Sequence, residues 1–333
     1  MSLNKGDEVI VSPRSFIISA SCVLNLGLKP IFADVGDDGN LDIGSISKIY
    51  NKKVKAIIIV HLNGLPCDLD PIVKFVKKNK LYLIEDCSQA HGARYKGKLV
   101  GSFGHVSTWS FCQDKIISTG GEGGMISTNN KKIWKFCWSY KDHGKNYNSV
   151  FYKKHKSNFK WLHDSLGSNH RMTEMQAAIG RYQLKFLNNQ VKKRNQIAKL
   201  YIKNLKSYFK KDIFFRKINF GCNKSASKFK SNLKSHFCLH AFYRLNFFIN
   251  KKKNQNKLIT ELNKKKIQCG VGSCPEIYRE KVFVKSGFYP KKRLPNAKLL
   301  GETSIMFPIN PYRSLVKIKK DIIIIKRILN KFI

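Results

Sequence analysis

The first 130 residues alternate short runs rich in β-branched and aromatic residues with stretches of helical periodicity. This alternation is typical of strand–helix–strand units, in which parallel strands form a sheet and helices cover its faces. Strands are predicted at residues 8–12, 30–34, 55–61, 81–86, 106–111 and 124–128, and helices at 15–26 and 70–79. The sequence therefore predicts an α/β fold with a mostly parallel sheet.

The pattern becomes helical from Met172 onward. Met172, Met175, Ile179, Tyr182 and Phe186 recur at helical spacing and lead into a lysine-rich helix that ends near Lys206. Beyond a polar, irregular segment at 207–240, we expect a strand at 241–249, a helix at 256–266 and a short helix at 321–333. We predict a large domain at 1–185 and a smaller α+β domain at 186–333.

The size and composition of the chain restrict its class. With 333 residues, of which 42% are hydrophobic, it can bury a sizeable core. Its first residues lack the apolar region of a secretory signal, and no apolar run approaches the roughly 20 residues that a membrane helix needs. We expect a cytoplasmic enzyme without a membrane partner.

The formal charge of +42 suggests nucleic-acid binding as an alternative. Residues 1–180 contain 25 Lys/Arg and 15 Asp/Glu, a net charge of +10, whereas residues 181–333 contain 38 and 6, a net charge of +32. The basic residues are spread along the second half, and no zinc-finger, RNA-recognition or helix-turn-helix pattern accompanies them. We predict no specific nucleic-acid partner, although weak attraction to anionic substrates is compatible with this charge.

One set of residues offers a metal-binding alternative. His236, Cys238 and His240 alternate along a predicted strand, with Cys269 and Cys274 downstream. Zinc sites usually contain closely spaced cysteine pairs, and no C-x-x-C pair is present. We therefore predict no metal site.

A carboxylate lies at the end of one predicted strand. Residues 81–86 end in Glu85 and Asp86 and lead into Cys87-Ser88-Gln89-Ala90-His91-Gly92. Ligands of open α/β sheets bind at the carboxyl ends of strands, where a carboxylate can keep the pyridinium nitrogen of pyridoxal 5'-phosphate (PLP) protonated. The competing interpretation is that Asp86 caps a following helix, and this residue alone favours the cap.

A lysine and a glycine-dense turn follow another strand. Residues 110–124 read S-F-C-Q-D-K-I-I-S-T-G-G-E-G-G. Lysine forms Schiff bases best where desolvation or nearby cations lower its pKa. Ser110 can donate its hydroxyl to a phosphate, and the glycines allow close backbone approach. Most lysines in so basic a chain lie at the surface, but apolar residues follow Lys115, which we interpret as a candidate catalytic residue.

Together, E-D-C-S-Q-A-H-G and S-F-C-Q-D-K-I-I-S-T-G-G-E-G-G strongly resemble segments of the DegT/DnrJ/StrS sugar aminotransferases. Residues 166–179 are similar to the family's G-x-N-x-R-M-x-E-x-Q-A-A stretch, and residues 6–13 to its G-D-E-V-I-V-P strand. The C-terminal region at 294–308 is also similar, so the likeness spans nearly the whole chain and is weakest at 207–240. It implies the PLP-dependent, aspartate aminotransferase-like (fold type I) architecture.

The resemblance implies specific roles at the cofactor. Lys115 would form the Schiff base with PLP and then move a proton between cofactor carbon and substrate carbon, and Asp86 would pair with the pyridinium nitrogen. Gln89 would contact the phenolic oxygen side of PLP, Ser110 its phosphate and Phe16 its ring face. The alternative for Phe16 is a core aromatic.

Two further residues connect the implied site to a second subunit. By the resemblance, Asn169, and with it Arg171, would reach the cofactor phosphate of the other subunit, which implies a homodimer with a shared active site. The alternative for Arg171 is a purely structural ion pair. We interpret His61 and His91 as packing residues.

The resemblance also implies the reaction. An amino group would pass from an amino acid, glutamate by expectation, to a nucleotide-linked keto-sugar in surface polysaccharide or amino-sugar biosynthesis. Related PLP-dependent sugar dehydratases have histidine in place of the lysine, so Lys115 disfavours that reaction. Family members have several dozen residues before the G-D-E-V strand, including a phosphate-binding loop, whereas this chain begins almost at that strand. A truncated, catalytically impaired partner subunit or remnant is therefore the alternative.

Overall fold

The computed structural model describes residues 3–156, 158–206, 208, 213–214, 238–249 and 254–332. The larger sheet consists of β1 (Glu8–Val11), β2 (Lys29–Phe32), β3 (Val54–Val60), β4 (Tyr82–Asp86), β7 (Val106–Ser110) and β8 (Gly124–Ser127). Among the described residues their order is β2-β1-β3-β4-β7-β8, and all neighbours are parallel except β7 and β8. The predicted α/β class with a mostly parallel sheet is confirmed.

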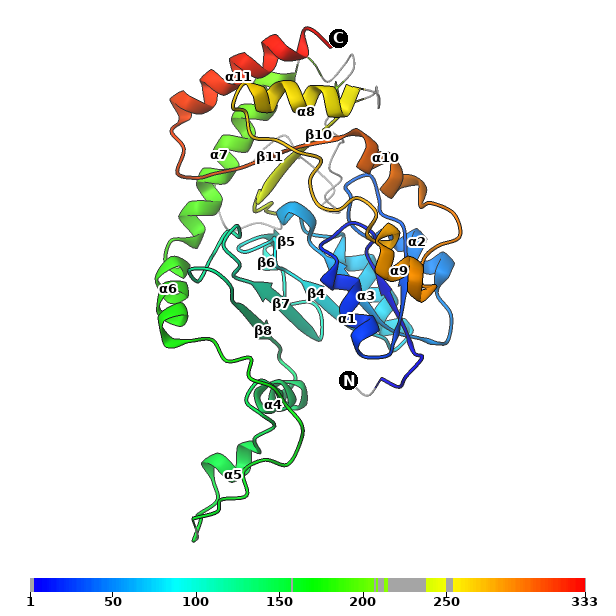
Figure 1. Cartoon of the computed structure of the whole chain (residues 1–333), viewed down its shortest axis with the longest axis vertical. Helices are drawn as coiled ribbons and strands as arrows, with labels where there is room; N and C mark the ends of the chain where they lie inside the picture. The colour runs from blue at the N-terminus through cyan, green and yellow to red at the C-terminus, as the bar shows by residue number, and fades with distance from the viewer. Residues whose placement is uncertain are drawn as a thin grey trace.

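Both faces of this sheet are apolar because successive side chains of a strand point to opposite sides. Ile10 and Ile57 pack into the cluster on one face, whereas Val11 and Ile58 pack into the cluster on the other. The covering helices are α1 (Ile18–Asn25) on the second face and α2 (Ile43–Ile49) and α3 (Leu69–Lys78) on the first (Figure 1). Each fully buried isoleucine or valine side chain contributes roughly 1.5–3 kcal/mol of transfer free energy.

A smaller antiparallel sheet with its own helices forms the C-terminal layer. It contains β9 (Ile213–Phe214), β10 (Arg244–Ile249), β11 (Ser304–Pro308), α7 (Leu187–Leu205), α8 (Gln255–Lys264) and α11 (Leu315–Leu329). Helix α11 begins earlier than the sequence pattern suggested, because the Ser314 hydroxyl accepts a hydrogen bond from the Lys317 N–H and caps it. The predicted boundary near residue 185 stays a prediction.

One C-terminal segment returns to the larger sheet. It comprises η4 (Ile277–Arg279), α9 (Lys281–Ser286) and α10 (Pro295–Thr303). Ile277 and Phe283 pack into the same cluster as Phe32 of β2. The Asp34 carboxylate accepts 2.9 Å hydrogen bonds from the N–H groups at the start of α10, those of Asn296 and Ala297. These contacts connect the C-terminal layer to the sheet.

Residues 131–171 form an arm that projects away from both sheets (Figure 1). The arm contains α4 (Lys131–Tyr140) and α5 (Tyr147–Phe151), and α6 (Glu174–Leu184) leads back to the C-terminal layer. A small hairpin of β5 (Arg94–Tyr95) and β6 (Lys98–Leu99) lies near the larger sheet. In the ranges that the structure describes, no helix has both the length and the apolarity needed to cross a bilayer.

Candidate active site

Asp86 is the last residue of β4, at the carboxyl end of the parallel sheet. Its Oδ2 accepts a 3.0 Å hydrogen bond from the Ser19 hydroxyl of α1, and its Oδ1 accepts one of 3.0 Å from the Ser88 N–H. A turn rather than a helix follows at residues 88–89, so the helix-capping interpretation is wrong. The two donors fix the orientation of a carboxylate that is only partly buried.

Lys115 lies on the loop after β7, the parallel neighbour of β4, so this loop starts at the same edge of the sheet as Asp86. The side chains of Ile116 and Ile117 are buried and anchor the loop. From α6, Gln183 accepts a hydrogen bond from the Ser118 N–H at 3.1 Å. The Lys115 side chain is only 18% exposed, so the amine is largely withdrawn from bulk water.

Steric constraints explain the glycines that follow Lys115. Gly120 has a φ of +81°, a left-handed conformation that glycine adopts without strain. A Cβ at Gly123 would lie 2.3 Å from the Thr119 Oγ1, and one at Gly124 would lie 3.0 Å from the Trp109 carbonyl oxygen. The turn therefore needs glycine for close packing around the loop of Lys115.

The charge environment of Lys115 stabilises its ammonium form. Its Nζ lies 3.2 Å from Asp114 Oδ1 and 5.4 Å from the centroid of the Tyr243 ring. Burial alone would lower the pKa of the amine, but the interactions with Tyr243 and Asp114 outweigh it and raise the pKa.

Gln89 and Ser110 occupy adjacent parts of the same edge. Gln89 is buried, and its Oε1 accepts a 2.8 Å hydrogen bond from the Asn63 N–H, which leaves its amide N–H groups available. Asn63 has a φ of +58°, and its buried side-chain oxygen has no hydrogen-bond partner. Ser110 ends β7, and its Oγ accepts from the Cys112 N–H at 3.3 Å, which leaves the hydroxyl proton available.

His91 is buried beside these residues. Its ring centroid lies 5.5 Å from that of Trp109 and 5.8 Å from that of Phe111. Burial, with the nearby Lys115 charge, lowers the pKa of His91 to about 4. The ring is therefore neutral at neutral pH, as the interpretation of a packing residue requires.

Phe16 and the arm residues lie in different surroundings. The Phe16 side chain is 69% exposed, so the core-aromatic interpretation is wrong. Asn169 and Arg171 are exposed residues of the arm, where Asn169 Oδ1 accepts from Arg171 Nε at 3.1 Å. Arg171 Nε also lies 3.5 Å from Asp142 Oδ1, so the structural ion pair forms. Among the described residues no hydrogen bond or ion pair joins either residue to Asp86 or Lys115.

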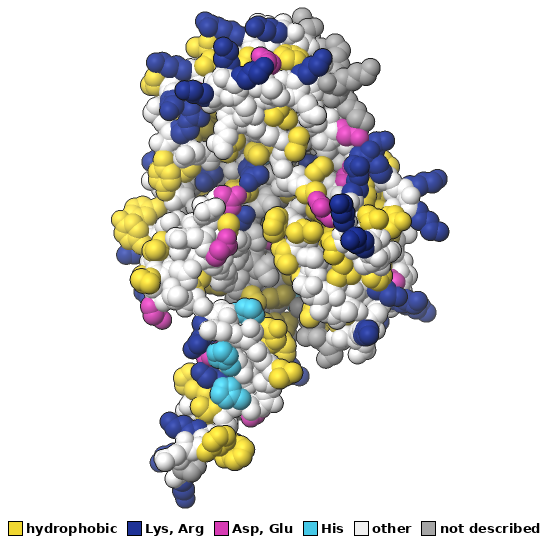
Figure 2. Space-filling view, in the orientation of Figure 1, with side chains coloured by type: hydrophobic (Ala, Val, Ile, Leu, Met, Phe, Trp, Pro, Cys, Tyr) yellow, Lys and Arg dark blue, Asp and Glu magenta, His cyan; other side chains and the backbone are white. Residues whose placement is uncertain are grey.

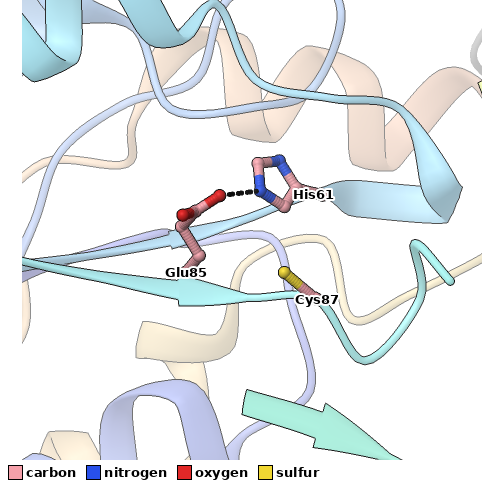
Figure 3. Close-up of side chains that lie close together, drawn as sticks. All are labelled: His61, Glu85 and Cys87. Atoms are coloured by element: carbon pink, nitrogen blue, oxygen red, sulfur yellow. Dashed lines mark hydrogen bonds and ion pairs between the residues drawn. The ribbon is translucent and has the colours of Figure 1, made fainter. Parts of the chain in front are cut away.

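A buried polar cluster was not recognised from the sequence as a unit. The potential ligand atoms of His61, Glu85 and Cys87 lie within 4.8 Å of one another (Figure 3). However, the Glu85 carboxylate already accepts from His61 Nε2 at 3.1 Å and from the backbone N–H groups of Gly101, Phe103 and Gly104 at 2.6–2.8 Å. His61 Nδ1 accepts from the Cys67 N–H at 3.0 Å. With these acceptors occupied, the cluster connects β3, β4 and the loop at 101–104 rather than binding a metal.

The metal alternative of the sequence involved other residues. His236 lies outside the described residues. His240 is buried, its Nδ1 accepts from the Phe242 N–H at 2.8 Å, and its ring stacks on that of Phe242. Within the part of the chain that the structure describes, Cys238, His240, Cys269 and Cys274 are not members of a group with metal-ligand spacing.

The fold and site define the class: an aspartate aminotransferase-like α/β protein with a lysine and a carboxylate at the carboxyl edge of its sheet. The chain belongs to the DegT/DnrJ/EryC1/StrS aminotransferase family, whose sequence profile matches residues 1–320.

Three known proteins illustrate the similarity. GDP-perosamine synthase of Escherichia coli O157:H7 is 38% identical over 220 residues, which cover 64% of this chain and 57% of that enzyme. The chain thus spans little more than half the length of this curated relative. An aminotransferase structure from Psychrobacter cryohalolentis has 42% identity and a TM-score of 0.90, and the match covers 99% of this chain and 82% of that one.

A more distant structure extends the likeness in fold. The E. coli GDP-4-keto-6-deoxy-D-mannose-3-dehydratase, solved with bound hydrated PLP, has 23% identity and a TM-score of 0.82, with 97% of this chain and 80% of that chain covered. This likeness concerns the fold alone.

Proposed function

We propose that this protein is a PLP-dependent aminotransferase that acts on a nucleotide-linked keto-sugar. The observation that carries the proposal is the position of Asp86 at the end of β4 and of Lys115 on the loop that follows β7, the parallel neighbour of β4, at one edge of the sheet. The amine is largely buried, and two donors orient the carboxylate. Aminotransfer needs an amine nucleophile and an anion opposite the ring nitrogen of the cofactor.

The polar groups at this edge fit PLP. Asp86 would pair with the pyridinium nitrogen, and the available N–H groups of Gln89 would point to the phenolic oxygen. The free hydroxyl proton of Ser110 would bind the phosphate, and the exposed ring of Phe16 would lie on the cofactor face. When bound, PLP supplies the electron sink for the reaction. The distantly similar dehydratase structure contains PLP, which agrees with this assignment.

The protein's own groups would then perform the proton chemistry. The Asp86 carboxylate would stabilise a positive charge on the ring nitrogen opposite it. Lys115 would bind the cofactor aldehyde covalently and, once released by the amino donor, would move a proton between substrate carbon and cofactor carbon. The neutral His91 ring would pack beside the lysine without competing for that proton.

The substrates are inferred from the relatives. The E. coli relative is a GDP-perosamine synthase, so we propose a nucleotide-linked keto-sugar as acceptor and an amino acid, glutamate first, as donor. Surface polysaccharide or amino-sugar biosynthesis would use the product. Lys and Arg side chains gather over the C-terminal layer (Figure 2) and favour the approach of an anionic nucleotide. The cytoplasmic location and the lack of a specific nucleic-acid partner stay predictions.

We further propose a homodimer in which the arm contacts the partner. Neither α4 nor α6 has a buried residue, and large apolar side chains of the arm and α6 are exposed (Figure 2). These are Phe136, Phe151, Tyr152, Phe159, Trp161, Leu166, Met175 and Tyr182. A pocket of about 510 Å³ beside α6 is lined partly by Ile179, Tyr182 and Phe186. Such extensive exposed apolar surface is typical of an interface, and Asn169 would reach the partner's cofactor from it.

Borohydride trapping tests the cofactor assignment. The full chain is incubated with PLP and reduced, and the modified peptide is identified by mass spectrometry. We expect the label on Lys115, its loss in Lys115→Ala, and weaker retention in Asp86→Asn. Lys55→Ala is the matched control, because it removes a lysine of β3 whose amine donates to the Lys52 carbonyl. A folded protein that takes up no PLP, or takes it up on other lysines alone, would overturn the proposal.

A second assay tests the reaction. Glutamate and a GDP-linked 4-keto-6-deoxy sugar are supplied to the PLP-loaded protein, and formation of the amino sugar and of 2-oxoglutarate is followed by mass spectrometry. Equal amounts of the two products would support aminotransfer. PLP binding without transfer to any nucleotide-linked keto-sugar would favour the impaired partner subunit instead.

A further inference from the structure

We propose that Asp114 is a positioning residue through which the C-terminal layer clamps the Lys115 amine and limits its reactivity. The inference rests on the proposed function, because it concerns the lysine that would bind PLP. It gives a role to three residues that the sequence analysis did not select as candidates: Asp114, Tyr243 and Arg244.

Three side chains converge on the Asp114 carboxylate. Lys115 Nζ lies 3.2 Å from Oδ1, and Arg244 Nη2 donates to Oδ2 at 3.1 Å. The Tyr243 hydroxyl also donates to Oδ2, and it accepts from Arg244 Nη2 at 3.1 Å. The carboxylate therefore binds the lysine with one oxygen and the C-terminal layer with the other.

Burial and strand pairing fix the positions of Tyr243 and Arg244. Tyr243 is buried and packs in one cluster with Ile116, the residue after Lys115. Arg244 is the first residue of β10, which pairs with β11. The Tyr243 ring lies within cation–π range of both cations, 5.4 Å from Lys115 Nζ and 4.8 Å from Arg244 Cζ. Asp114 is thus held from a strand some 130 positions away in sequence.

The charges agree with this geometry. Burial would raise the pKa of Asp114, but the Tyr243 hydrogen bond and the Lys115 charge outweigh it and lower the pKa. The pKa of Lys115 is raised in turn, although burial opposes the ammonium form. Among the described residues, other titratable groups near Lys115 are Cys112 on its own loop, His91, and Arg244 on the second oxygen of the Asp114 carboxylate.

The consequence is chemical. An amine attacks a carbonyl carbon only in its neutral form, so a carboxylate that stabilises the ammonium slows attachment. Each pKa unit by which the ammonium is stabilised reduces the neutral fraction about tenfold at a pH below the pKa. The clamp therefore lowers the small neutral fraction of Lys115, and this fraction rises when Asp114 is engaged elsewhere or neutralised.

Competitive labelling with acetic anhydride measures this directly and needs no PLP. The full chain, freed of PLP with hydroxylamine, is labelled across the neutral to alkaline range, and the acetylation of Lys115 is quantified by mass spectrometry. We expect Asp114→Asn to raise the labelling rate at neutral pH by about three- to tenfold and to move the titration midpoint to lower pH. Tyr243→Phe should act in the same direction with a smaller effect.

The controls separate the clamp from a general loss of structure. Asp70 pairs with the surface Lys96, so Asp70→Asn should leave the Lys115 profile unchanged. In Asp114→Glu the midpoint of the Lys115 labelling profile should stay at the higher pH seen in the wild type, because the negative charge is retained. If Asp114→Asn does not fold, Tyr243→Phe and Arg244→Lys test the same clamp. A Lys115 profile that is identical in wild type and these folded variants overturns the inference.

The two proposals fail in different ways. Absence of a PLP label on Lys115 would contradict the proposed function but leave the acetylation profile as a test of the clamp. An unchanged acetylation profile alongside normal PLP trapping would contradict only the clamp. If both proposals hold, PLP attachment at neutral pH should be faster in Asp114→Asn by a similar factor.

Discussion

The parallel sheet and the arm both contain many apolar side chains, but they differ in where those side chains lie. In β3, every residue except Lys55 is buried, whereas no residue of α4 is. The sheet therefore obtains its stability from contacts within the chain. The large apolar side chains of the arm lack such cover in the described structure, which is the basis of the proposed dimer interface.

The arm is held locally by aromatic contacts. The Tyr147 ring centroid lies 4.9 Å from that of Trp138 and 4.8 Å from that of Phe151. An ion pair joins Lys145 and Asp142 at 3.1 Å, and a single pair of this kind contributes at most about 1 kcal/mol. Aromatic pairs contribute about 0.5–1.5 kcal/mol each, far less than a buried sheet.

The largest expected effect is a loss of stability from a substitution inside the larger sheet. Ile57 is fully buried in β3, so Ile57→Ala should lower the free energy of unfolding by about 3 kcal/mol through lost burial and a cavity. Urea unfolding followed by circular dichroism measures the change. Leu166→Ala in the arm, where the side chain is 94% exposed, is the matched control and should change unfolding by less than about 0.5 kcal/mol. If Ile57→Ala and Leu166→Ala lowered the free energy of unfolding equally, the contrast between the buried sheet and the exposed arm would be contradicted.

The next effect concerns the polar cluster of Glu85 inside the sheet. Glu85→Gln places an amide against backbone N–H groups and should cost about 2 kcal/mol. Burial would raise the pKa of Glu85, but hydrogen bonds from His61 and the backbone outweigh it and lower the pKa. Its stabilisation is thus present above the unfolded pKa of about 4.3 and disappears as pH falls through the folded value. The variant should show a flatter acid limb in unfolding measured against pH.

A smaller effect tests the arm as an interface. Phe136→Glu places a charge among exposed aromatic side chains and should weaken self-association at least about tenfold. Sedimentation velocity over a concentration series measures it. Leu26→Glu, equally exposed at the end of α1, is the control and should leave association unchanged. A wild-type protein that is monomeric at all concentrations would contradict the proposed homodimer.

The smallest effect is expected at the ion pairs of the arm. Asp142→Asn removes the carboxylate that pairs with Lys145 and Arg171, whose side chains are 27% and 47% exposed, so solvent screens both cations. We expect no measurable change in urea unfolding at moderate salt. A clear loss of stability would show that the arm is held more firmly than its exposure indicates.

Much of the sheet could be predicted from local patterns. The six strands of the larger sheet appear within two residues of their expected limits, because strand periodicity is a property of neighbouring residues. Helix α1 begins at Ile18 rather than near residue 15. The helix-capping role of Asp86 was wrong, because residue 88 begins a turn and Ser19 of α1 contacts the carboxylate instead. A contact between α1 and the end of β4 has no local sequence signal.

The sequence by itself determined the order of strands and helices, the lysine and carboxylate at successive strand ends, and the family likeness. Only the tertiary structure decided what surrounds them: Ser19 beside Asp86, and Tyr243 and Arg244 on the Asp114 that contacts Lys115. The physical reason is the distance along the sequence between the residues that interact. Periodicity depends on adjacent residues, whereas the charge state of an amine depends on every group within a few ångströms, and packing brings those groups together from distant parts of the chain.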